Sequence, residues 1–314
     1  MNVRQDYKVE DSDCPLDDPS MYANVFSFMG QSLSRDLDAP GLNTVLMGIP
    51  YDLGTTGRPG TRLGPLSIRQ ASAHLRWEEQ RYPWTFNAFD RLKMIDYGDI
   101  QFRSGDSEDM LSVVESEASR IVSTGKSLIS LGGDHFVTLP LLRAHASVHE
   151  PLALIHFDAH TDTYSHSQRY DHGSMFYHAP RERLIDPSCS VQIGIRTEYT
   201  RQDHPFLVLD ASRVNEVSVA TSVATIRERV GKRRAYLSFD IDCLDPAYAP
   251  GTGTPVAGGL SSGKVLDILH GIADLDIVGF DLVEVSPPYD TAEVTALAGA
   301  TIALQFLYMM AANR

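Results

Sequence analysis

Acidic residues and histidines recur at a spacing of two at two places in this 314-residue chain. Asp158, His160 and Asp162 form the first cluster, and Asp240 and Asp242 form the second. Each cluster follows an apolar run that is typical of a strand. Alternate side chains of an extended chain lie on one face. Each cluster can therefore direct its acids and imidazoles toward one point, as ligands of a cation do.

The charge of these clusters indicates how many cations are needed. Together they contain four carboxylates, and each partly buried ion costs several kcal/mol. One divalent cation would leave about two negative charges uncompensated. Two divalent cations would balance all four carboxylates. We therefore predict a two-metal hydrolytic site rather than a generic acidic patch.

A third segment, 132–135 (GGDH), ends in an acid and an imidazole and also follows an apolar run. Taken alone, each of the three motifs also fits a turn at the end of a strand, and the glycine pair fits a tight turn. Cys243 directly follows Asp242 and offers a sulfur ligand, but the neighbouring ligands are hard. We expect Cys243 to be a small packing residue.

Eight short apolar runs alternate with helical patterns and must position these clusters. The predicted strands cover 44–49, 92–95, 127–131, 152–157, 190–195, 206–209, 235–239 and 277–285. The predicted helices include 107–124, 138–146, 219–230, 262–273 and 293–310, with an N-cap in the segment 260–262. Such alternation indicates a mostly parallel sheet covered on both faces, in a three-layer α/β/α fold. Ligands of such sheets bind at the carboxyl ends of the strands, where all three clusters fall.

Composition limits the function classes. The chain is 43% hydrophobic and 22% charged, and 41 acidic against 27 basic residues give a net charge of −14. This balance argues against nucleic acid and anionic membranes as partners. Three cysteines (Cys14, Cys189 and Cys243) imply no disulfide framework. We find no secretory signal and expect no apolar run near the roughly 18–20 residues of a membrane span, so we predict a cytoplasmic protein.

No repeat or domain boundary is visible after the polar N-terminus. We predict an extended arm over residues 1–20 and a single catalytic domain over residues 21–314.

The chain resembles the ureohydrolase family, which contains arginases, agmatinases and their relatives. The resemblance runs from about residue 40 to the end and is closest to bacterial members that cleave agmatine. It implies an arginase-like fold. The segments that carry it are GRPGTRLGPLSIR (57–69), GGDHFVTLP (132–140), HFDAHTDTY (156–164), DHGSMF (171–176), SFDIDCLDPAYAPGTGTP (238–255) and DLVEVSPPYD (281–290).

This resemblance implies a ligand set for two ions. His135 and Asp162 would bind one ion, His160 and Asp242 the other, and Asp158 and Asp240 would bridge both. Four carboxylates and two imidazoles form a hard site that favours two Mn²⁺ per subunit. Ligand type alone leaves Fe²⁺, Co²⁺, Ni²⁺ and Zn²⁺ open.

The resemblance also implies catalytic roles. Bound divalent ions lower the pKa of water, and a hydroxide bridging the two ions would be oriented by Asp162. Glu284 would hold the guanidinium of the substrate through paired hydrogen bonds, although a structural carboxylate that caps backbone groups is the alternative. His172 would deliver a proton to the departing amine. His166 competes for that role without motif support. His156, in the strand before Asp158, is expected to pack beside the ligands or support them.

The predicted substrate is a small cationic guanidine. Arginases carry an asparagine at the position of Tyr164, and their loop before the position of His172 is longer. Both departures favour agmatine as the substrate, which would be cleaved to putrescine and urea. Tyr164, Tyr170 and Met175 would either line the substrate pocket or pack within the loop. Hydrolases of guanidinobutyrate or guanidinopropionate share the catalytic motifs and remain alternatives, and arginine is less favoured.

Two further classes share parts of this pattern: a deacetylase of the same architecture, with one zinc ion and other ligands, and a guanidine-binding protein with an inactive metal centre. The complete ligand set, with His172 and Glu284, favours the hydrolase. The resemblance also implies a homo-oligomer, either a trimer or a hexamer.

Overall fold

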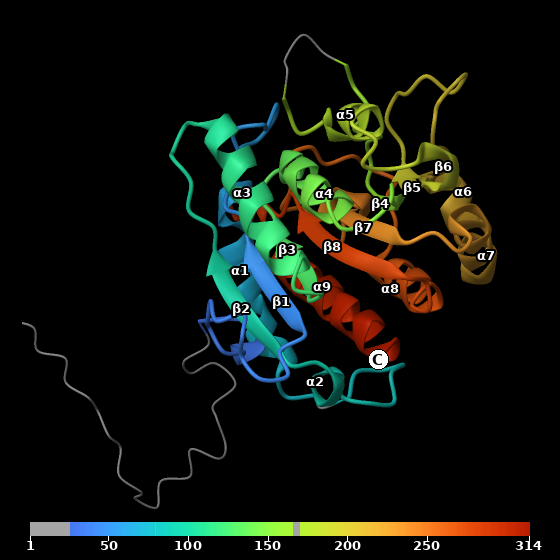
Figure 1. Cartoon of the computed structure of the whole chain (residues 1–314). Coiled ribbons are helices and arrows are strands. Elements are labelled where there is room, and N and C mark those ends of the chain that lie inside the picture. Colours follow the sequence, from blue (N-terminus) through green and yellow to red (C-terminus); the bar gives the residue numbers. More distant parts are fainter. Residues whose placement is uncertain (1–25, 79, 166–169) are drawn as a thin grey trace, which may run out of the picture.

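The computed structural model describes residues 26–78, 80–165 and 170–314 (Figure 1). The predicted arm and His166 lie outside the described residues. Eight strands form one sheet in the order β2-β1-β3-β8-β7-β4-β5-β6, and every neighbouring pair is parallel. The strands are β1 (Thr44–Gly48), β2 (Met94–Asp99), β3 (Ser127–Leu131), β4 (Ala153–Phe157), β5 (Val191–Ile195), β6 (Leu207–Asp210), β7 (Ala235–Asp240) and β8 (Ile277–Val283).

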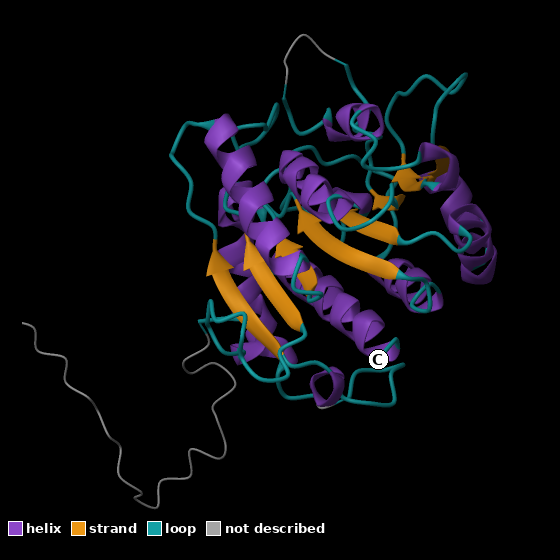
Figure 2. Ribbon diagram, in the orientation of Figure 1, coloured by secondary structure: helices purple, strands orange, loops and turns teal. Residues whose placement is uncertain are grey.

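The central strands are buried on both faces, which explains why their sequences are continuous apolar runs rather than alternating patterns. Every residue of β1, β4, β5 and β7 is buried. All eight predicted strands are present, within two residues at most boundaries. The predicted α/β class with a parallel sheet between helical layers is confirmed (Figure 2).

Helices cover both faces of the sheet (Figure 1). The apolar side chains of one face pack with α1 (Gly64–Ser72), α6 (Ala211–Glu216), α7 (Val219–Val230), α8 (Ser262–Gly271) and α9 (Val294–Ala312). Those of the other face pack with α3 (Ser107–Val122), α4 (Thr138–Ala146) and α5 (Met175–Arg181). The short α2 (Ala88–Arg91) contacts α9.

The predicted helices correspond to α3, α4, α7, α8 and α9. The side chain of Ser261 accepts a hydrogen bond from the backbone N–H of Lys264 and caps α8, as the segment 260–262 predicts.

The expectation about apolar runs is wrong for α9. This helix has 19 residues with a mean hydropathy of 1.6, so its length and composition alone would suit a membrane span. However, 78% of its apolar window is buried within the protein. It is apolar around its circumference because the sheet, α1 and α8 surround it, which is the usual reason for such a helix in a core.

The order of the strands brings four carboxyl ends together. After β3 the chain passes to β4, and β8 and β7 later fill the space between these two strands. The strands β3, β8, β7 and β4 are therefore neighbours, although they come from distant parts of the sequence. Such a reversal in strand order leaves a crevice at the carboxyl edge of a parallel sheet, where ligands bind.

Candidate metal centre and active site

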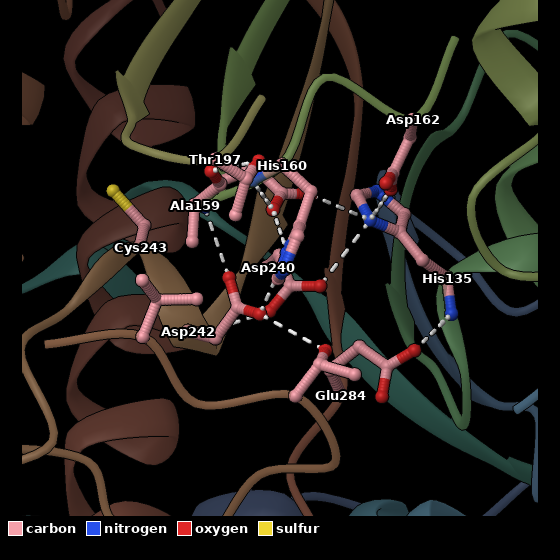
Figure 3. A network of polar contacts seen from close by, with 12 residues as sticks. His135, Ala159, His160, Asp162, Thr197, Asp240, Asp242, Cys243 and Glu284 are labelled. Atoms are coloured by element: carbon pink, nitrogen blue, oxygen red, sulfur yellow. Dashed lines mark hydrogen bonds and ion pairs between the residues drawn. The ribbon is translucent and has the colours of Figure 1, made fainter. Parts of the chain in front are cut away.

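The predicted ligands extend from three of these four strands. His135 opens a short 3-10 turn after β3, Asp158 directly follows β4, and Asp240 is the last residue of β7. Asp242 lies in the 3-10 turn that follows β7. His160 and Asp162 follow Asp158 in the same loop. All six lie around one centre, as Figure 3 shows for those that it labels.

Three carboxylates surround one imidazole nitrogen of His135. The Nδ1 atom of His135 lies 3.1 Å from Oδ2 of Asp158, 2.9 Å from Oδ2 of Asp162 and 3.4 Å from Oδ2 of Asp240. His135 and Asp158 are fully buried, and Asp162 and Asp240 are nearly so. His135, Asp158 and Asp162 belong, with the neighbouring His156, to the first group of donor atoms that could hold a cation, and Asp240 lies beside this group.

A second group forms around His160. Its Nδ1 atom lies 3.2 Å from Oδ1 of Asp158 and 3.1 Å from Oδ2 of Asp242. Asp158 thus directs one oxygen to each imidazole, as a bridging carboxylate would. Asp240 directs Oδ2 toward the first group, while its Oδ1 accepts the backbone N–H of Asp242 at 2.7 Å. These contacts support a bridging role for Asp158, and that of Asp240 stays a prediction.

Buried hydrogen bonds fix the tautomer of His135. Asp281 accepts hydrogen bonds from Thr138, Tyr236 and Ser238 at 2.9, 2.8 and 2.6 Å. Because the Ser238 hydroxyl proton is directed to Asp281, its oxygen accepts from Nε2 of His135 at 2.8 Å. A proton therefore resides on Nε2, so Nδ1 is the nitrogen that would bind a metal ion, once that ion takes the place of any proton held there by the carboxylates. This Nδ1 is buried and has no hydrogen-bond partner among the described residues.

The carboxylates of the cluster are costly to ionise unless cations bind them. Burial raises the pKa of Asp162, and the charge of Asp158 raises it further, to about 7. Burial also raises the pKa of Asp240 well above its usual range, and the charges of Asp242 and Asp158 add to the effect. Hard oxygen donors, and buried carboxylates whose ionisation is costly, fit hard divalent ions.

Glu284 and His172 lie beside the predicted ligands. Glu284 follows β8 with a φ of 65°, so the predicted strand over 277–285 ends earlier than expected, at Val283. Its Oε1 accepts the backbone N–H of His135 at 2.9 Å and lies 2.8 Å from Nδ1 of His172. Its Oε2 is buried and has no partner among the described residues. Such a carboxylate oxygen is costly unless a cationic group binds it.

His172 is held at both ring nitrogens. Nδ1 contacts Glu284, and Nε2 lies 2.7 Å from the hydroxyl of Thr56 and 3.1 Å from its backbone N–H. Burial lowers the pKa of His172, but the charge and the hydrogen bond of Glu284 outweigh that effect and raise the pKa to about 9. The raised pKa favours the doubly protonated ring at neutral pH, in which Nε2 donates to the hydroxyl of Thr56 instead of accepting from its backbone N–H.

A cavity of about 210 Å³ opens onto the centre. Its lining residues are Thr56, His160, Asp162, Tyr164, Asp171, His172, Gly173, Asp240 and Thr254. Tyr164 thus lines the pocket, whereas the Tyr170 ring packs 5.0 Å from that of Phe136 and Met175 is fully buried in the core. The Cys243 thiol donates to the carbonyl of Ile193 at 3.6 Å and points away from the carboxylates, as a packing residue does (Figure 3).

Several residues of the site carried no distinct signal in the sequence. Thr56 stands one residue before the motif 57–69, Gly253 and Thr254 lie inside the motif 238–255, and Asp171 directly precedes His172. Ser238 and Asp281 also lie within quoted motifs, but only their contact in space reveals their role. Motif membership was the one signal that could have found these residues, and it does not reach Thr56.

Comparison with known proteins identifies the family to which this fold and this cluster of candidate metal ligands belong. The model of the Arginase family matches residues 42–309, so the chain belongs to this family. The resemblance predicted from the motifs is confirmed.

The relatives point further within the family. The agmatinase of Neisseria meningitidis serogroup A is 56% identical over 297 residues, covering 95% of this chain and 96% of that protein. The agmatinase of Edwardsiella ictaluri is 53% identical over 300 residues, covering 95% and 97%. A solved structure described as a hypothetical agmatinase from Burkholderia thailandensis has a TM-score of 0.89 and 46% identity, covering 93% of each chain. Proclavaminate amidino hydrolase from Streptomyces clavuligerus has a TM-score of 0.87 and 38% identity, covering 94% of this chain and all of that one.

Proposed function

We propose that this chain hydrolyses agmatine to putrescine and urea with two Mn²⁺ ions. His135, Asp158, Asp162 and Asp240 would hold one ion, and His160 and Asp242, with the two bridging carboxylates Asp158 and Asp240, the other. Two buried atoms carry the proposal: Nδ1 of His135, which faces three carboxylates, and Oε2 of Glu284, and neither has a hydrogen-bond partner among the described residues. The first suits a metal ion, and the second suits a guanidinium.

When bound, the two ions supply Lewis-acid activation of water and neutralise the four carboxylates. The side chains of the protein carry out the remaining steps. Asp162 lies at the edge of the cavity and can orient the attacking water through its second oxygen. Its backbone has a φ of 51°, an uncommon conformation for a non-glycine residue that is frequent at functional sites.

Glu284 would bind the guanidinium, which stays protonated at neutral pH. Hydrogen bonds to a carboxylate are strong when both partners are charged, and they hold the planar group in one orientation. A Cβ atom built on Gly253 would lie 3.3 Å from Oε2 of Glu284. Glycine at this position leaves the space in front of the carboxylate open.

His172 would protonate the departing amine. Contacts at both ring nitrogens hold the ring in one orientation, and the pKa of about 9 keeps it protonated at neutral pH. A general acid needs that combination of orientation and protonation.

The charge of the cavity supports a cationic substrate. Once metal ions neutralise Asp162 and Asp240, Asp171 remains as an acidic lining residue, and none of the described lining residues is a lysine or an arginine. A carboxylate tail, as in guanidinobutyrate or guanidinopropionate, would find no lysine or arginine among these residues and would share the cavity with Asp171. The similarity to proclavaminate amidino hydrolase nevertheless makes guanidino acids the second candidate class.

A urea-release assay with added Mn²⁺ across agmatine, guanidinobutyrate, guanidinopropionate and arginine tests the proposal. We expect kcat/KM for agmatine to exceed the others by about a hundredfold, which corresponds to about 3 kcal/mol in recognition of the tail. A preference for a guanidino acid would overturn the substrate. Two bound ions without cleavage of any guanidine would overturn the reaction.

We further propose that residues 21–314 act as one catalytic domain, that the protein is cytoplasmic, and that it assembles as a homo-oligomer, either a trimer or a hexamer. Light scattering coupled to size exclusion would measure the assembly.

A further inference from the structure

A buried side chain beside the metal centre has no part in the reaction described above. His156 lies on β4, is fully buried, and packs its ring 4.5 Å from that of Phe176. Its Nε2 atom lies 2.8 Å from Oδ2 of Asp158, the carboxylate that faces both imidazole groups. The nitrogen is close enough to the centre to be a metal ligand itself. The hydrogen bonds of His156 decide whether it binds a metal ion or supports Asp158.

Gln192 lies next to His156 on the neighbouring strand β5, in register with it. It is fully buried, and its amide nitrogen lies 2.6 Å from the carbonyl oxygen of Thr161 and 3.0 Å from Nδ1 of His156. A carbonyl oxygen can only accept a hydrogen bond, so the amide nitrogen of Gln192 must face Thr161. The reverse orientation would place two oxygens against each other. The orientation of this amide is therefore determined by the backbone.

This orientation determines the tautomer of His156. Its Nδ1 accepts a hydrogen bond from Gln192, so its proton resides on Nε2. A protonated nitrogen cannot bind a metal, and it donates instead to Oδ2 of Asp158. His156 is thereby excluded as a ligand and holds one oxygen of Asp158 in place.

His204 completes the chain of contacts. Its Nε2 lies 2.9 Å from the amide oxygen of Gln192, to which it must donate. Its ring packs 5.1 Å from that of Tyr199. Both lie on a groove of about 1130 Å³ next to the metal centre, which shares Tyr164 with the catalytic cavity. All donors in this chain point inward, from His204 through Gln192 and His156 to Asp158.

We propose that Gln192 is a positioning residue for the metal centre, an inference that rests on the proposed dinuclear site. Through His156 it orients the bridging carboxylate Asp158, and through the carbonyl of Thr161 it holds the loop that carries His160 and Asp162. Residues that orient metal ligands in this way commonly change metal affinity or activity by about 10- to 100-fold when they are removed.

The test compares Gln192→Met with Gln305→Met, and the readout is Mn²⁺ affinity by competition with a chelator. Gln305 is a matched control: it is also buried, accepts a hydrogen bond from Trp84 at 3.0 Å, and lies on α9 away from the centre. We expect Gln192→Met to weaken the binding of at least one ion by about 10- to 100-fold. Gln305→Met should leave both affinities within about threefold of the unsubstituted protein.

The thermal midpoint of the metal-free proteins separates positioning from general stability, because both substitutions remove a buried amide. If the two variants lose similar stability but only Gln192→Met loses Mn²⁺ affinity, the proposal holds. Unchanged Mn²⁺ affinity in folded Gln192→Met overturns it. If this variant does not fold, Gln192→Asn, whose amide is too short to reach both partners, should show the same loss of affinity, and normal affinity there would overturn the proposal. Because the experiment measures metal binding, it can test the role of Gln192 even if the protein does not cleave agmatine.

Discussion

The Oε1 atom of Glu284 lies 2.8 Å from Nδ1 of His172, and this contact leaves the other carboxylate oxygen of Glu284 open. One carboxylate thus fixes the proposed proton donor and still presents an atom to the substrate. In the proposed reaction Glu284 would bind the guanidinium, and His172 would protonate the guanidinium nitrogen that leaves.

Replacing Glu284 by glutamine tests the first of these roles. The amide keeps an oxygen for the backbone N–H of His135 but loses the charge that holds the guanidinium. Loss of one partner from a buried charged pair costs about 2–5 kcal/mol, so we expect kcat/KM to fall at least about thirtyfold. Metal analysis should still find two ions per chain. Loss of metal in this variant would make Glu284 a structural residue.

The pKa of His172 predicts how activity depends on pH. A general acid works only while it is protonated, so kcat should fall as the pH rises through about 9. In His172→Asn the rate should be lower by about 10²–10⁴-fold, with metal content unchanged, and this alkaline limb should disappear. A variant that keeps the same limb would show that another group titrates.

The same shift predicts a change in stability. Because the pKa of His172 is raised above its usual value of 6.5, the charged pair with Glu284 stabilises the fold fully below pH 6.5. That contribution is lost as the pH rises through about 9. The free energy of unfolding of the metal-free protein should therefore decline over this range more than that of His172→Asn. Denaturant titrations below pH 6.5 and above about pH 9 measure this decline. An equal decline in the two proteins would contradict a stabilising charged pair between His172 and Glu284.

The strands and most of the candidate ligands could be predicted because they depend on local patterns. Buried parallel strands are continuous apolar runs, and Asp158, His160 and Asp162 are close enough in the sequence to lie in one short loop. The extended backbone that the spacing of two implied is not found there, because the chain bends at residues 159–160 and Asp162 has a φ of 51°. The strand boundary at Glu284 was missed, since the apolar run continues through Val285 while the backbone turns at a positive φ. No local pattern in the sequence predicts the turn at Glu284, because it depends on how the chain packs at the crevice.

Contacts between strands were beyond sequence reasoning for another reason. Ser238 supports His135 only because β7 and β8 are neighbours and Asp281 lies in register with Ser238. The order of strands depends on how the whole chain crosses the sheet, which local periodicity does not encode. Helices α1 and α5 were missed because glycine and proline weaken their helical signal.

Asp158 and Asp242 should differ in the number of ions lost. Asp158 faces the imidazoles of both His135 and His160, whereas Asp242 faces that of His160 and accepts hydrogen bonds from Ala159 and Thr254. We expect Asp158→Ala to lose both ions and nearly all activity. We expect Asp242→Ala to retain the ion at the His135 group more tightly than the ion at the His160 group. Elemental analysis after dialysis measures the stoichiometry. Two ions retained in Asp158→Ala would refute the bridging assignment.

The space in front of Glu284 can be tested with one methyl group. In Gly253→Ala the added carbon would lie 3.3 Å from Oε2 of Glu284, where the guanidinium would bind. We expect KM for agmatine to rise by about tenfold or more, with two ions retained, because the methyl group would contact Glu284 and the carbonyl oxygen of Arg58, 3.2 Å away, but none of the proposed metal ligands. Gly263→Ala, where no heavy atom lies within 4 Å of the added carbon, is the control and should leave KM unchanged. Equal KM values for the two variants would place the guanidinium elsewhere.

The support of His135 by Ser238 can be separated from simple loss of a buried hydroxyl. Ser238 and Ser130 flank Asp281 in register on its two neighbouring strands, and both are fully buried. Only the Ser238 hydroxyl links Asp281 to His135, since the Ser130 hydroxyl has no hydrogen-bond partner among the described residues.

Ser238→Ala leaves the Nε2 proton of His135 without an acceptor, so the proton can move to Nδ1 and block the lone pair that would bind metal. We expect Mn²⁺ affinity at the His135 group to fall by about 10- to 100-fold. Ser130→Ala should keep normal affinity, because its hydroxyl orients no ligand. Chelator competition on both variants gives the comparison, and equal affinities would mean that the position of His135 is set by packing rather than by this hydrogen bond.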